Sequence, residues 1–248
     1  MLSIIIPTFQ EEKYLGRLLE SIKKQTLQPD EIIIADNHSK DRTREIAKEY
    51  GCIIVDGGIP SEGRNAGAKT AKGDLLLFLD ADNVITKRNF IEKFIKSFEK
   101  RKLDIATTFV TLENINIKSL IVNLGFSTSK IVNELLLKHL KKVSSESGAC
   151  ILMKKDLFLA AGMFDENMYV HEDSELFQKV TKQGARYGLV AQNINTSDRR
   201  LQKMDSKIFS QTSLFVVYAF FRRFFGFKDN EKFIKKYEKM YGRLGGEE

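Results

Sequence analysis

Short apolar segments rich in Ile, Leu and Val alternate with amphipathic segments in the N-terminal part of the chain. The apolar segments are too short for helices and are apolar at successive positions, which is typical of strands buried on both faces of a parallel sheet. Between them, apolar residues recur at helical spacing, as Leu15, Leu18 and Ile22 do. The pattern therefore predicts an α/β fold whose mostly parallel central sheet is flanked by helices. The expected strands are 2–6, 31–35, 52–55 and 74–79, and the expected helices are 11–25, 41–50, 90–100 and one beginning near 61.

The second half of the chain follows a less regular pattern. Strands are expected at 105–112 and 149–153, a long basic helix at 119–140, and shorter helices at 156–161 and 172–183. No linker, internal repeat or low-complexity tract separates these segments from the first half. We therefore expect one domain over 1–205, followed by a basic, Phe-rich helical tail over 206–248.

Charge and cysteine content limit the partners and the location of the protein. Lys and Arg number 40 against 33 acidic residues, a formal net charge of +7, which favours a nucleotide, a nucleic acid or an anionic membrane face as partner. Cys52 and Cys150 belong to no metal-binding pattern and are expected in buried strands, so a reducing cytoplasm is predicted. Because the first strand begins at Leu2, we expect no signal peptide. No apolar stretch reaches the roughly 20 residues of a membrane-spanning helix.

The triplet Asp80-Ala81-Asp82 directly follows the apolar segment 75–79. Open α/β sheets bind their ligands beyond the carboxyl ends of the strands, which is where these two carboxylates are expected. Carboxylate oxygens suit Mg²⁺ or Mn²⁺ bound beside a phosphate-bearing substrate. The same triplet is also common in turns and helix caps, so the argument for a metal site depends on the segments around it.

Four segments carry polar residues at predicted strand and helix ends. The first two read Ile-Ile-Pro-Thr-Phe-Gln-Glu-Glu at 5–12 and Ile-Ile-Ala-Asp-Asn-His-Ser-Lys-Asp-Arg-Thr at 33–43. The others are Gly-Arg-Asn-Ala-Gly at 63–67, ahead of Gly73-Asp74 and the Asp triplet, and Gly-Met-Phe-Asp-Glu at 162–166, ahead of His171-Glu172-Asp173. In this order they resemble the inverting nucleotide-sugar glycosyltransferases of family 2, over about 2–184. The resemblance implies a GT-A fold, with a nucleotide-binding half at 1–100 and an acceptor-binding half at 101–205.

The resemblance also implies a nucleotide-sugar donor, a UDP-sugar in the first instance, and roles for the matching residues. Asp36 would accept the N3–H of uracil, Arg64 would face the diphosphate, and Asp82 would ligate the metal. Asp80 would hold the ribose or bind the metal through water. For Phe9, contact with the base competes with ordinary core packing. The implied nucleotide-binding residues are Pro7, Thr8, Phe9, Glu11, Asp36, Arg64, Asp80 and Ala81.

An inverting transfer needs a general base opposite the leaving group, and the resemblance assigns that role to Asp173. The alternative is that Glu172 and Asp173 only stabilise a helix N-terminus. The sequence Ser-Asp-Arg-Arg at 197–200 resembles an Arg pair found after the last strand of some small family members. It would clamp a phosphate, or it would be a solvated basic loop. The candidates for contact with the acceptor or with phosphate are Gly148, Ala149, Glu172, Arg199 and Arg200.

The chain departs from the family pattern at the nucleotide end. Gln10, Asn37 and His38 stand where Asn, Asp and Gly are commoner. The Trp-containing signature of processive, polymerising members is absent because the chain has no Trp, so a single sugar transfer is expected.

Two other classes of protein share some of these features. A sugar-phosphate nucleotidyltransferase has a similar sheet, but its Gly-rich phosphate loop should follow the first strand, and 7–12 contain no glycine. A non-catalytic module that binds nucleic acid or a membrane would explain the charge. It predicts basic residues gathered on one face, whereas here carboxylates gather at strand ends, so no nucleic acid partner is expected.

The Phe-rich tail bears on which acceptor is expected, because it has the pattern of a membrane-binding helix. The apolar stretch 214–221 is separated from further phenylalanines by Arg222 and Arg223, a pattern that suits a helix lying in a membrane interface. Peripheral contact through 206–228, with the basic helix 119–142 as a second contact, would place the protein at the inner face of the cell membrane. A lipid-linked acceptor such as a polyprenyl phosphate would then follow. The alternative is that both segments pack on the domain or form a dimer seam.

Overall fold

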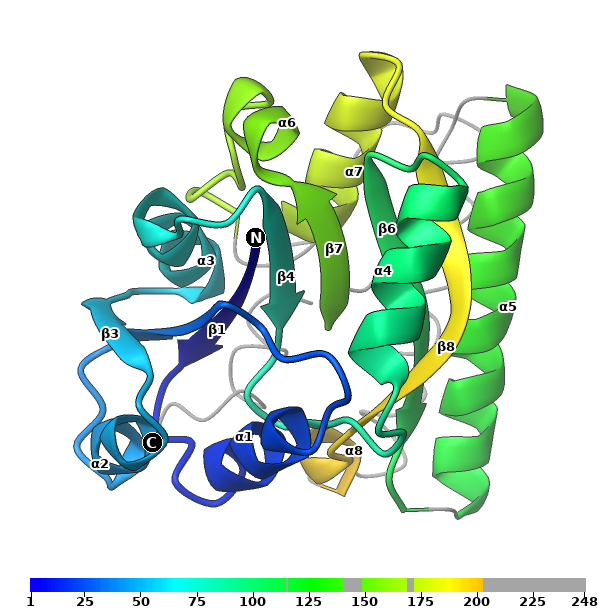
Figure 1. Cartoon of the computed structure of the whole chain (residues 1–248). Helices are drawn as coiled ribbons and strands as arrows, with labels where there is room; N and C mark the ends of the chain where they lie inside the picture. Colours follow the sequence, from blue (N-terminus) through cyan, green and yellow to red (C-terminus); the bar gives the residue numbers. More distant parts are fainter. Residues whose placement is uncertain (115, 141–148, 169–171, 203–248) are drawn as a thin grey trace.

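The computed structural model describes residues 1–114, 116–140, 149–168 and 172–202. The strands are β1 Leu2–Thr8, β2 Glu31–Asp36, β3 Ile53–Asp56, β4 Leu75–Leu79, β5 Asn83–Val84, β6 Ile105–Leu112, β7 Cys150–Lys154 and β8 Tyr187–Thr196. The helices are α1 Leu15–Lys23, α2 Thr43–Glu49, α3 Pro60–Thr70, α4 Phe90–Lys100, α5 Ile117–Leu140, α6 Lys155–Ala160, α7 Glu172–Lys182 and α8 Arg199–Gln202. Within this part of the chain the strands form one sheet, in the order β3-β2-β1-β4-β7-β6-β8-β5 (Figure 1).

The N-terminal half of the sheet is parallel, as its apolar segments predict. β1 pairs in parallel with β2 and β4, and β2 pairs in parallel with β3. β7 then runs antiparallel to both β4 and β6, while β6 and β8 are parallel to each other. The sheet as a whole is therefore mixed, and the parallel arrangement continues only as far as β4.

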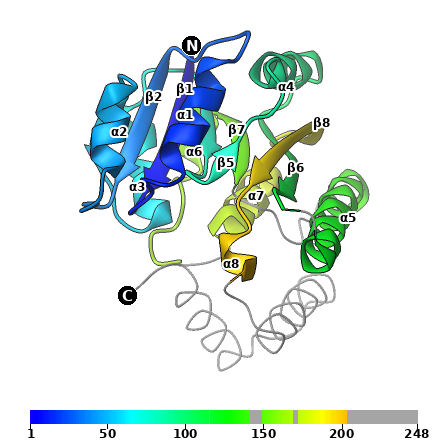
Figure 2. The ribbon, with the colours of Figure 1, turned by 90° about the horizontal axis from the view of Figure 1, so that it is seen from below.

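Successive side chains of the central strands enter two separate hydrophobic cores. In β1, Ile4 and Ile6 belong to one core and Ile5 to the other, as the pleat of a strand requires. α1 and α4 cover the first face, where Phe94 is buried, and α3, α6 and α7 cover the second, where Phe177 is buried (Figure 2). α5 packs against β6 and β8 at the far end of the sheet (Figure 1). Burial on both faces explains why the central strands are apolar at every position.

β8 and β5 fall outside the predicted strands. β8 contains Gly188, Asn193 and Asn195, so it lacks both an apolar run and a clean alternation. Two of its polar side chains are hydrogen-bonded to β6: the Asn193 amide donates to Thr111 Oγ1 at 2.8 Å, and Thr111 Oγ1 donates to Asn195 Oδ1 at 3.0 Å. The pairing of β8 with β6 supplies these partners, and it cannot be read from either segment alone.

Of the two cysteines expected in buried strands, one lies in such a strand. Cys150 is buried in β7, whereas Cys52 precedes β3 and is only half-buried, and both are free thiols. α3 lies so close to β1 that a Cβ on Gly67 would come within 2.5 Å of Ile5 Cγ2. None of the described helices has both the length and the apolar character needed to cross a bilayer.

Candidate active site

β1, β2 and β4 end at one edge of the sheet, the lower edge in Figure 1, because they run parallel. The register places Thr8 beside Asp36, and Asp80 directly follows β4. α8 lies at the same edge (Figure 1). Ligands of open α/β sheets bind at such an edge, and most of the candidate residues meet here.

Asp36 is a fully buried carboxylate at the end of β2. Its Oδ1 accepts a hydrogen bond from Thr8 Oγ1 at 3.0 Å. Its Oδ2 accepts from the Ser39 backbone N–H at 3.0 Å and from Arg44 Nη1 at 3.1 Å. Three donors therefore fix this buried side chain in one orientation.

The loops after β1 and β2 each hold a residue in the left-handed backbone region. The φ angle is 52° at Gln10 and 51° at His38. Asn and Gly adopt this region at lower cost, and these are the residues that the family pattern has at the two positions. The Gln10 N–H donates to Ser39 Oγ at 2.8 Å, so the loops support each other. Between Pro7, which is half-buried, and Gln10, Phe9 is 44% exposed, which rules out core packing for its ring.

Arg64 of α3 joins the end of β4 to the start of α7. Its Nη2 donates to Asp80 Oδ1 at 2.7 Å, and its Nη1 donates to Glu172 Oε1 at 2.7 Å. The guanidinium carbon lies 5.5 Å from the centre of the Phe164 ring. Burial lowers the pKa of Arg64, but the charges of Asp80 and Glu172, with a further contribution from Asp173, raise the pKa by more. The buried guanidinium is therefore held as a cation among carboxylates.

Asn65 fixes the loop that leads to α7. Its Nδ2 donates to the Phe164 carbonyl and to Glu166 Oε1, each at 2.9 Å, and its Oδ1 accepts from the Phe164 N–H at 3.1 Å. Asp173 lies in the first turn of α7, where its side chain is largely buried and its Oδ1 accepts from the Ser174 N–H at 2.6 Å. α3 thus anchors the segment that carries Glu172 and Asp173.

Arg199, the first residue of α8, binds two further carboxylates. Its Nη1 and Nη2 donate to the two carboxylate oxygens of Glu11, at 2.7 and 2.6 Å. Its Nε lies 3.3 Å from Asp82 Oδ2, and its guanidinium carbon lies 4.7 Å from the centre of the Tyr14 ring. Burial raises the pKa of Glu11, and the charges of Asp82 and Asp80 act in the same direction, while Arg199 offsets part of the rise.

The Asp triplet is held by β8 and by the segment before β7. Asp82 Oδ2 accepts from Ser197 Oγ at 3.1 Å, and Asp82 Oδ1 lies 3.3 Å from Thr196 Oγ1. The carbonyl of Ala149 accepts from the Asn83 side-chain amide and from the Asp80 N–H. Ala81, between the two acids, is buried.

Some candidates cannot be placed in this arrangement. Gly148 and the proposed membrane segment 206–228 lie outside the described residues. For Arg200, only the backbone in α8 is described.

The donor set at this edge suits a divalent cation only in part. Among the described residues, no group of three or more His, Cys, Asp or Glu side chains could hold a metal ion. Asp80 and Asp82 are two carboxylates on one short loop, and each is paired with an arginine. Mg²⁺ is commonly held by one or two carboxylates together with substrate phosphates and water, and this pair of residues fits that mode.

Several contacts in the site carry no signal in the sequence. Arg44 and Tyr14 are not candidates by any local pattern, yet Arg44 contacts Asp36 and Tyr14 contacts Arg199. Arg199 and Glu11 are 188 residues apart along the chain. Covariation between such positions in related sequences is the kind of signal that would reveal them.

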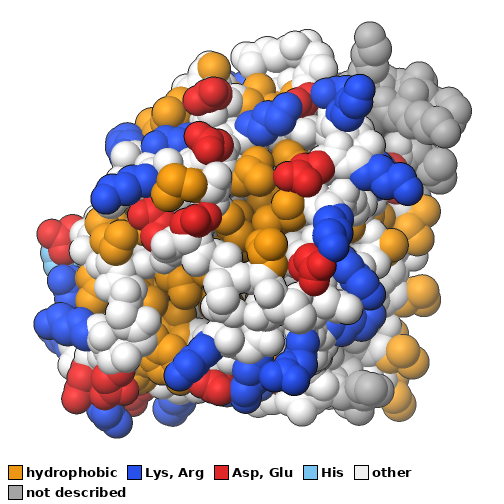
Figure 3. All heavy atoms as spheres, viewed as in Figure 1, with side chains coloured by type: hydrophobic (Ala, Val, Ile, Leu, Met, Phe, Trp, Pro, Cys, Tyr) orange, Lys and Arg blue, Asp and Glu red, His pale blue; other side chains and the backbone are white. Residues whose placement is uncertain are grey.

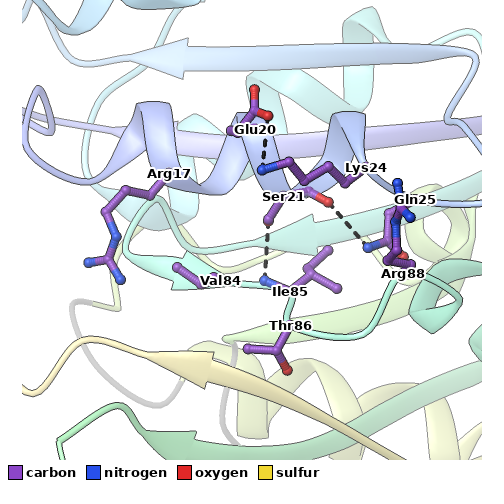
Figure 4. A pocket seen from close by; sticks show the side chains of 9 residues that line it. All are labelled: Arg17, Glu20, Ser21, Lys24, Gln25, Val84, Ile85, Thr86 and Arg88. Atoms are coloured by element: carbon purple, nitrogen blue, oxygen red, sulfur yellow. Dashed lines mark hydrogen bonds and ion pairs between the residues drawn. The ribbon is translucent and has the colours of Figure 1, made fainter.

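A pocket of about 340 Å³ lies between α1 and the loop after β5 (Figure 4). Its walls include Arg17, Lys24 and Arg88, with Ser21 at its base accepting a hydrogen bond from the Ile85 N–H at 3.1 Å. None of the candidate site residues lines this pocket. It is therefore distinct from the strand-end site.

Residues 3–160, more than half of the chain, match the family model described as glycosyl transferase family 2. The minor teichoic acid biosynthesis protein GgaB of Bacillus subtilis (strain 168) is 29% identical over 201 residues, which is 76% of this chain and 22% of GgaB. The chain thus spans less than a quarter of the length of this relative.

The fold is also similar to two solved transferase structures. S. aureus TarS 1–349 in complex with UDP-GlcNAc superposes with a TM-score of 0.63 at 20% identity, over 92% of this chain and 73% of that chain. The mannosyltransferase PcManGT from Pyrobaculum calidifontis, in complex with GDP-Man and Mn²⁺, superposes with a TM-score of 0.65 at 15% identity. The match covers 98% of this chain and 69% of that chain. At these identities the likeness concerns the fold, and the expected GT-A fold is confirmed.

Proposed function

The chain belongs to glycosyl transferase family 2, and on that premise we propose that it transfers a single sugar from a nucleotide-sugar to an acceptor with inversion at the anomeric carbon. The observation that carries the proposal is the pairing of Arg64 with both Asp80 and Glu172. One guanidinium brings the carboxylates expected at the donor next to those expected at the acceptor. A transfer reaction needs both sets arranged around one reacting carbon.

We propose a UDP-sugar as the donor. Asp36 offers only acceptor oxygens, which suit the N3–H of uracil, and its three protein donors hold it in one orientation. The exposed ring of Phe9 offers a flat apolar surface for the base at the end of β1. The fold alone does not select the base, because one similar structure contains UDP-GlcNAc and another contains GDP-Man.

Asp82 and Asp80 are the residues that would hold Mg²⁺ or Mn²⁺ together with diphosphate oxygens. Bound there, the cation would neutralise the charge that develops on the nucleoside diphosphate as the glycosidic bond breaks. Arg64 and Arg199 already form ion pairs with these carboxylates and add positive charge beside the leaving group.

Asp173 is the proposed general base. It lies in the first turn of α7, next to Glu172 in the chain, and its charge acts on Arg64. In this role its carboxylate takes the proton of the acceptor hydroxyl as the oxygen attacks the anomeric carbon. The hydrogen bond from Arg64 to Glu172 ties the start of α7 to α3 for this step.

We further propose that the acceptor is linked to a lipid and that the enzyme works at an anionic membrane surface. α5 carries five large apolar side chains that are 48 to 81% exposed, and they recur at helical spacing: Ile117, Leu120, Ile121, Leu124 and Ile131. Hydrophobic side chains accordingly line the right-hand edge of the molecule, where α5 lies (Figure 3). No acidic residue occurs between Ile117 and Ile131, so nothing on this stretch of α5 repels anionic headgroups.

The transferase proposal is tested by incubating the protein with a panel of nucleotide-sugars and Mn²⁺ and measuring release of the nucleoside diphosphate. Metal-dependent release from one donor by the wild type, lost in Asp82→Ala, would support the reaction and identify the donor. Absence of nucleotide binding, with or without Mn²⁺, would refute it. Leu159→Glu, a change at an exposed residue of α6, serves as the matched control.

The membrane proposal is tested by flotation with vesicles that contain anionic lipid. The wild type and Leu159→Glu should float, whereas the double variant Leu120→Glu/Leu124→Glu should stay in the soluble fraction. If the wild type itself stays soluble, the membrane proposal is wrong. Light scattering then shows whether the apolar side of α5 instead joins two copies of the chain.

A further inference from the structure

All three guanidinium nitrogens of Arg199 contact carboxylate oxygens. Nη1 and Nη2 form two parallel hydrogen bonds to Glu11, and Nε lies 3.3 Å from Asp82 Oδ2. This forked pairing is the strongest geometry available to an arginine and a carboxylate. Arg199 is therefore the main positive counter-charge of Glu11, and it shares Asp82 with any cation that binds there.

Hydrogen bonds hold the chain beside Arg199, whereas the Arg199 side chain itself is partly exposed. The Asp198 carboxylate, which precedes it, is buried and accepts hydrogen bonds from Asn114 Nδ2 and Gln202 Nε2, each at 2.8 Å. The side chain of Arg199 is 29% exposed, so its guanidinium is reachable from solvent. The start of α8 thus fixes the base of a long cationic side chain at the edge of the site.

A divalent cation on Asp82 and the guanidinium of Arg199 compete for the same carboxylate. Two positive charges that share one carboxylate would repel each other strongly wherever water is partly excluded. Arg199 could relieve that repulsion by turning toward a group of opposite charge. The diphosphate of a nucleotide-sugar is such a group, and guanidinium binds phosphate oxygens in the same forked geometry.

We propose that Arg199 is an exchangeable counter-charge: it neutralises Asp82 and Glu11 in the free protein, and it moves to the diphosphate when a divalent cation and the nucleotide bind. This inference rests on the proposed function, because it takes Asp82 as a metal ligand. It makes cation binding and nucleotide binding depend on each other through one side chain. Arg199 is then a positioning residue that limits metal binding in the absence of the donor.

The exchange predicts that Arg199→Gln changes the affinities for Mn²⁺ and for UDP in opposite directions. Both affinities can be measured by titration calorimetry, which requires no turnover. Binding of Mn²⁺ alone should become about threefold to fivefold tighter because Asp82 loses its competitor, a change of the size expected for one partly exposed ion pair. Binding of UDP in the presence of saturating Mn²⁺ should become about tenfold weaker, or more, because a charge-assisted hydrogen bond to the diphosphate is lost. A merely structural role for Arg199 would weaken both.

Two further variants keep the test decisive if Arg199→Gln folds poorly. Arg199→Lys keeps the charge but loses the fork, so UDP binding should weaken while Mn²⁺ binding stays near the wild-type value. Arg17→Gln removes an arginine from an exposed ion pair with Glu113 and should change neither constant. If both constants in Arg199→Gln move in the same direction, or neither moves, the exchange is refuted. If the wild type does not bind UDP even with Mn²⁺, the proposed function itself fails, and the exchange fails with it.

Discussion

Replacing Arg64 by Met should destabilise the fold more than any change at a surface ion pair. The Arg64 side chain is 5% exposed, and it is the partner of Asp80 and Glu172, which are 35% and 12% exposed. Removing one partner of a buried ion pair typically costs about 3–5 kcal/mol, because the charge left behind has no compensation. Since Asp80 can regain water, we expect the lower end, about 3 kcal/mol. For a domain of this size that corresponds to a fall in Tm of roughly 6–12 °C.

Urea unfolding followed by far-UV circular dichroism measures this loss as a shift of the midpoint at constant slope. Arg17→Met is the control, because it breaks an ion pair whose members are 48% and 21% exposed, for which the expected loss is below about 1 kcal/mol. Adding Glu172→Gln to Arg64→Met should recover part of the stability, since it removes one uncompensated charge. The reasoning is refuted if Arg64→Met loses no more stability than the control, or if Glu172→Gln brings no recovery.

Three other outcomes follow from the described contacts. Asp173→Asn should lower kcat by about 10²–10⁴-fold while UDP binding by calorimetry is unchanged, and weakened UDP binding would count against its role as the base. Gly67→Ala should lower thermal stability by about 1–3 kcal/mol, because its Cβ would lie 2.5 Å from Ile5 Cγ2. In α5, a Cβ added at Gly125 would have no atom within 4 Å, so Gly125→Ala should instead raise the stability by up to about 1 kcal/mol. A change in stability of the same sign for both variants would contradict the packing argument. Burial raises the pKa of the Cys150 thiol to about 12, so iodoacetamide at pH 8 should modify it only in urea, as the mass of the proteolytic peptide that contains Cys150 would show.

The departures from the family pattern acquire a physical meaning only in three dimensions. Gln10 and His38 can be recognised as unusual from the sequence, but not as strained. The structure shows that both have positive φ, where Asn and Gly are better tolerated. In this chain, the backbone after β1 and β2 therefore has a shape that Asn and Gly would adopt at lower cost.

Local periodicity predicted the parallel half of the sheet because each central strand is buried on both faces by its own apolar residues. The same reasoning failed at β8, where Asn193 and Asn195 interrupt the apolar pattern and find hydrogen-bond partners through the pairing with β6. It also could not show that β7 runs antiparallel between β4 and β6. Strand direction within a sheet depends on how the connecting segments cross it, which periodicity does not record.

For the site, the sequence by itself determined which chemical groups lie at the ends of strands and at the start of a helix. These groups are Asp36, the Asp80-Ala81-Asp82 triplet and the acids that begin α7. A strand end fixes the position of its own residues, so these could be identified one segment at a time. Only the tertiary structure decided how they are paired. Arg64 meets Glu172 across 108 residues, and Arg199 meets Glu11 across 188. Such pairings arise because burying a carboxylate requires a counter-charge nearby, and which arginine supplies it depends on the folding of the whole sheet.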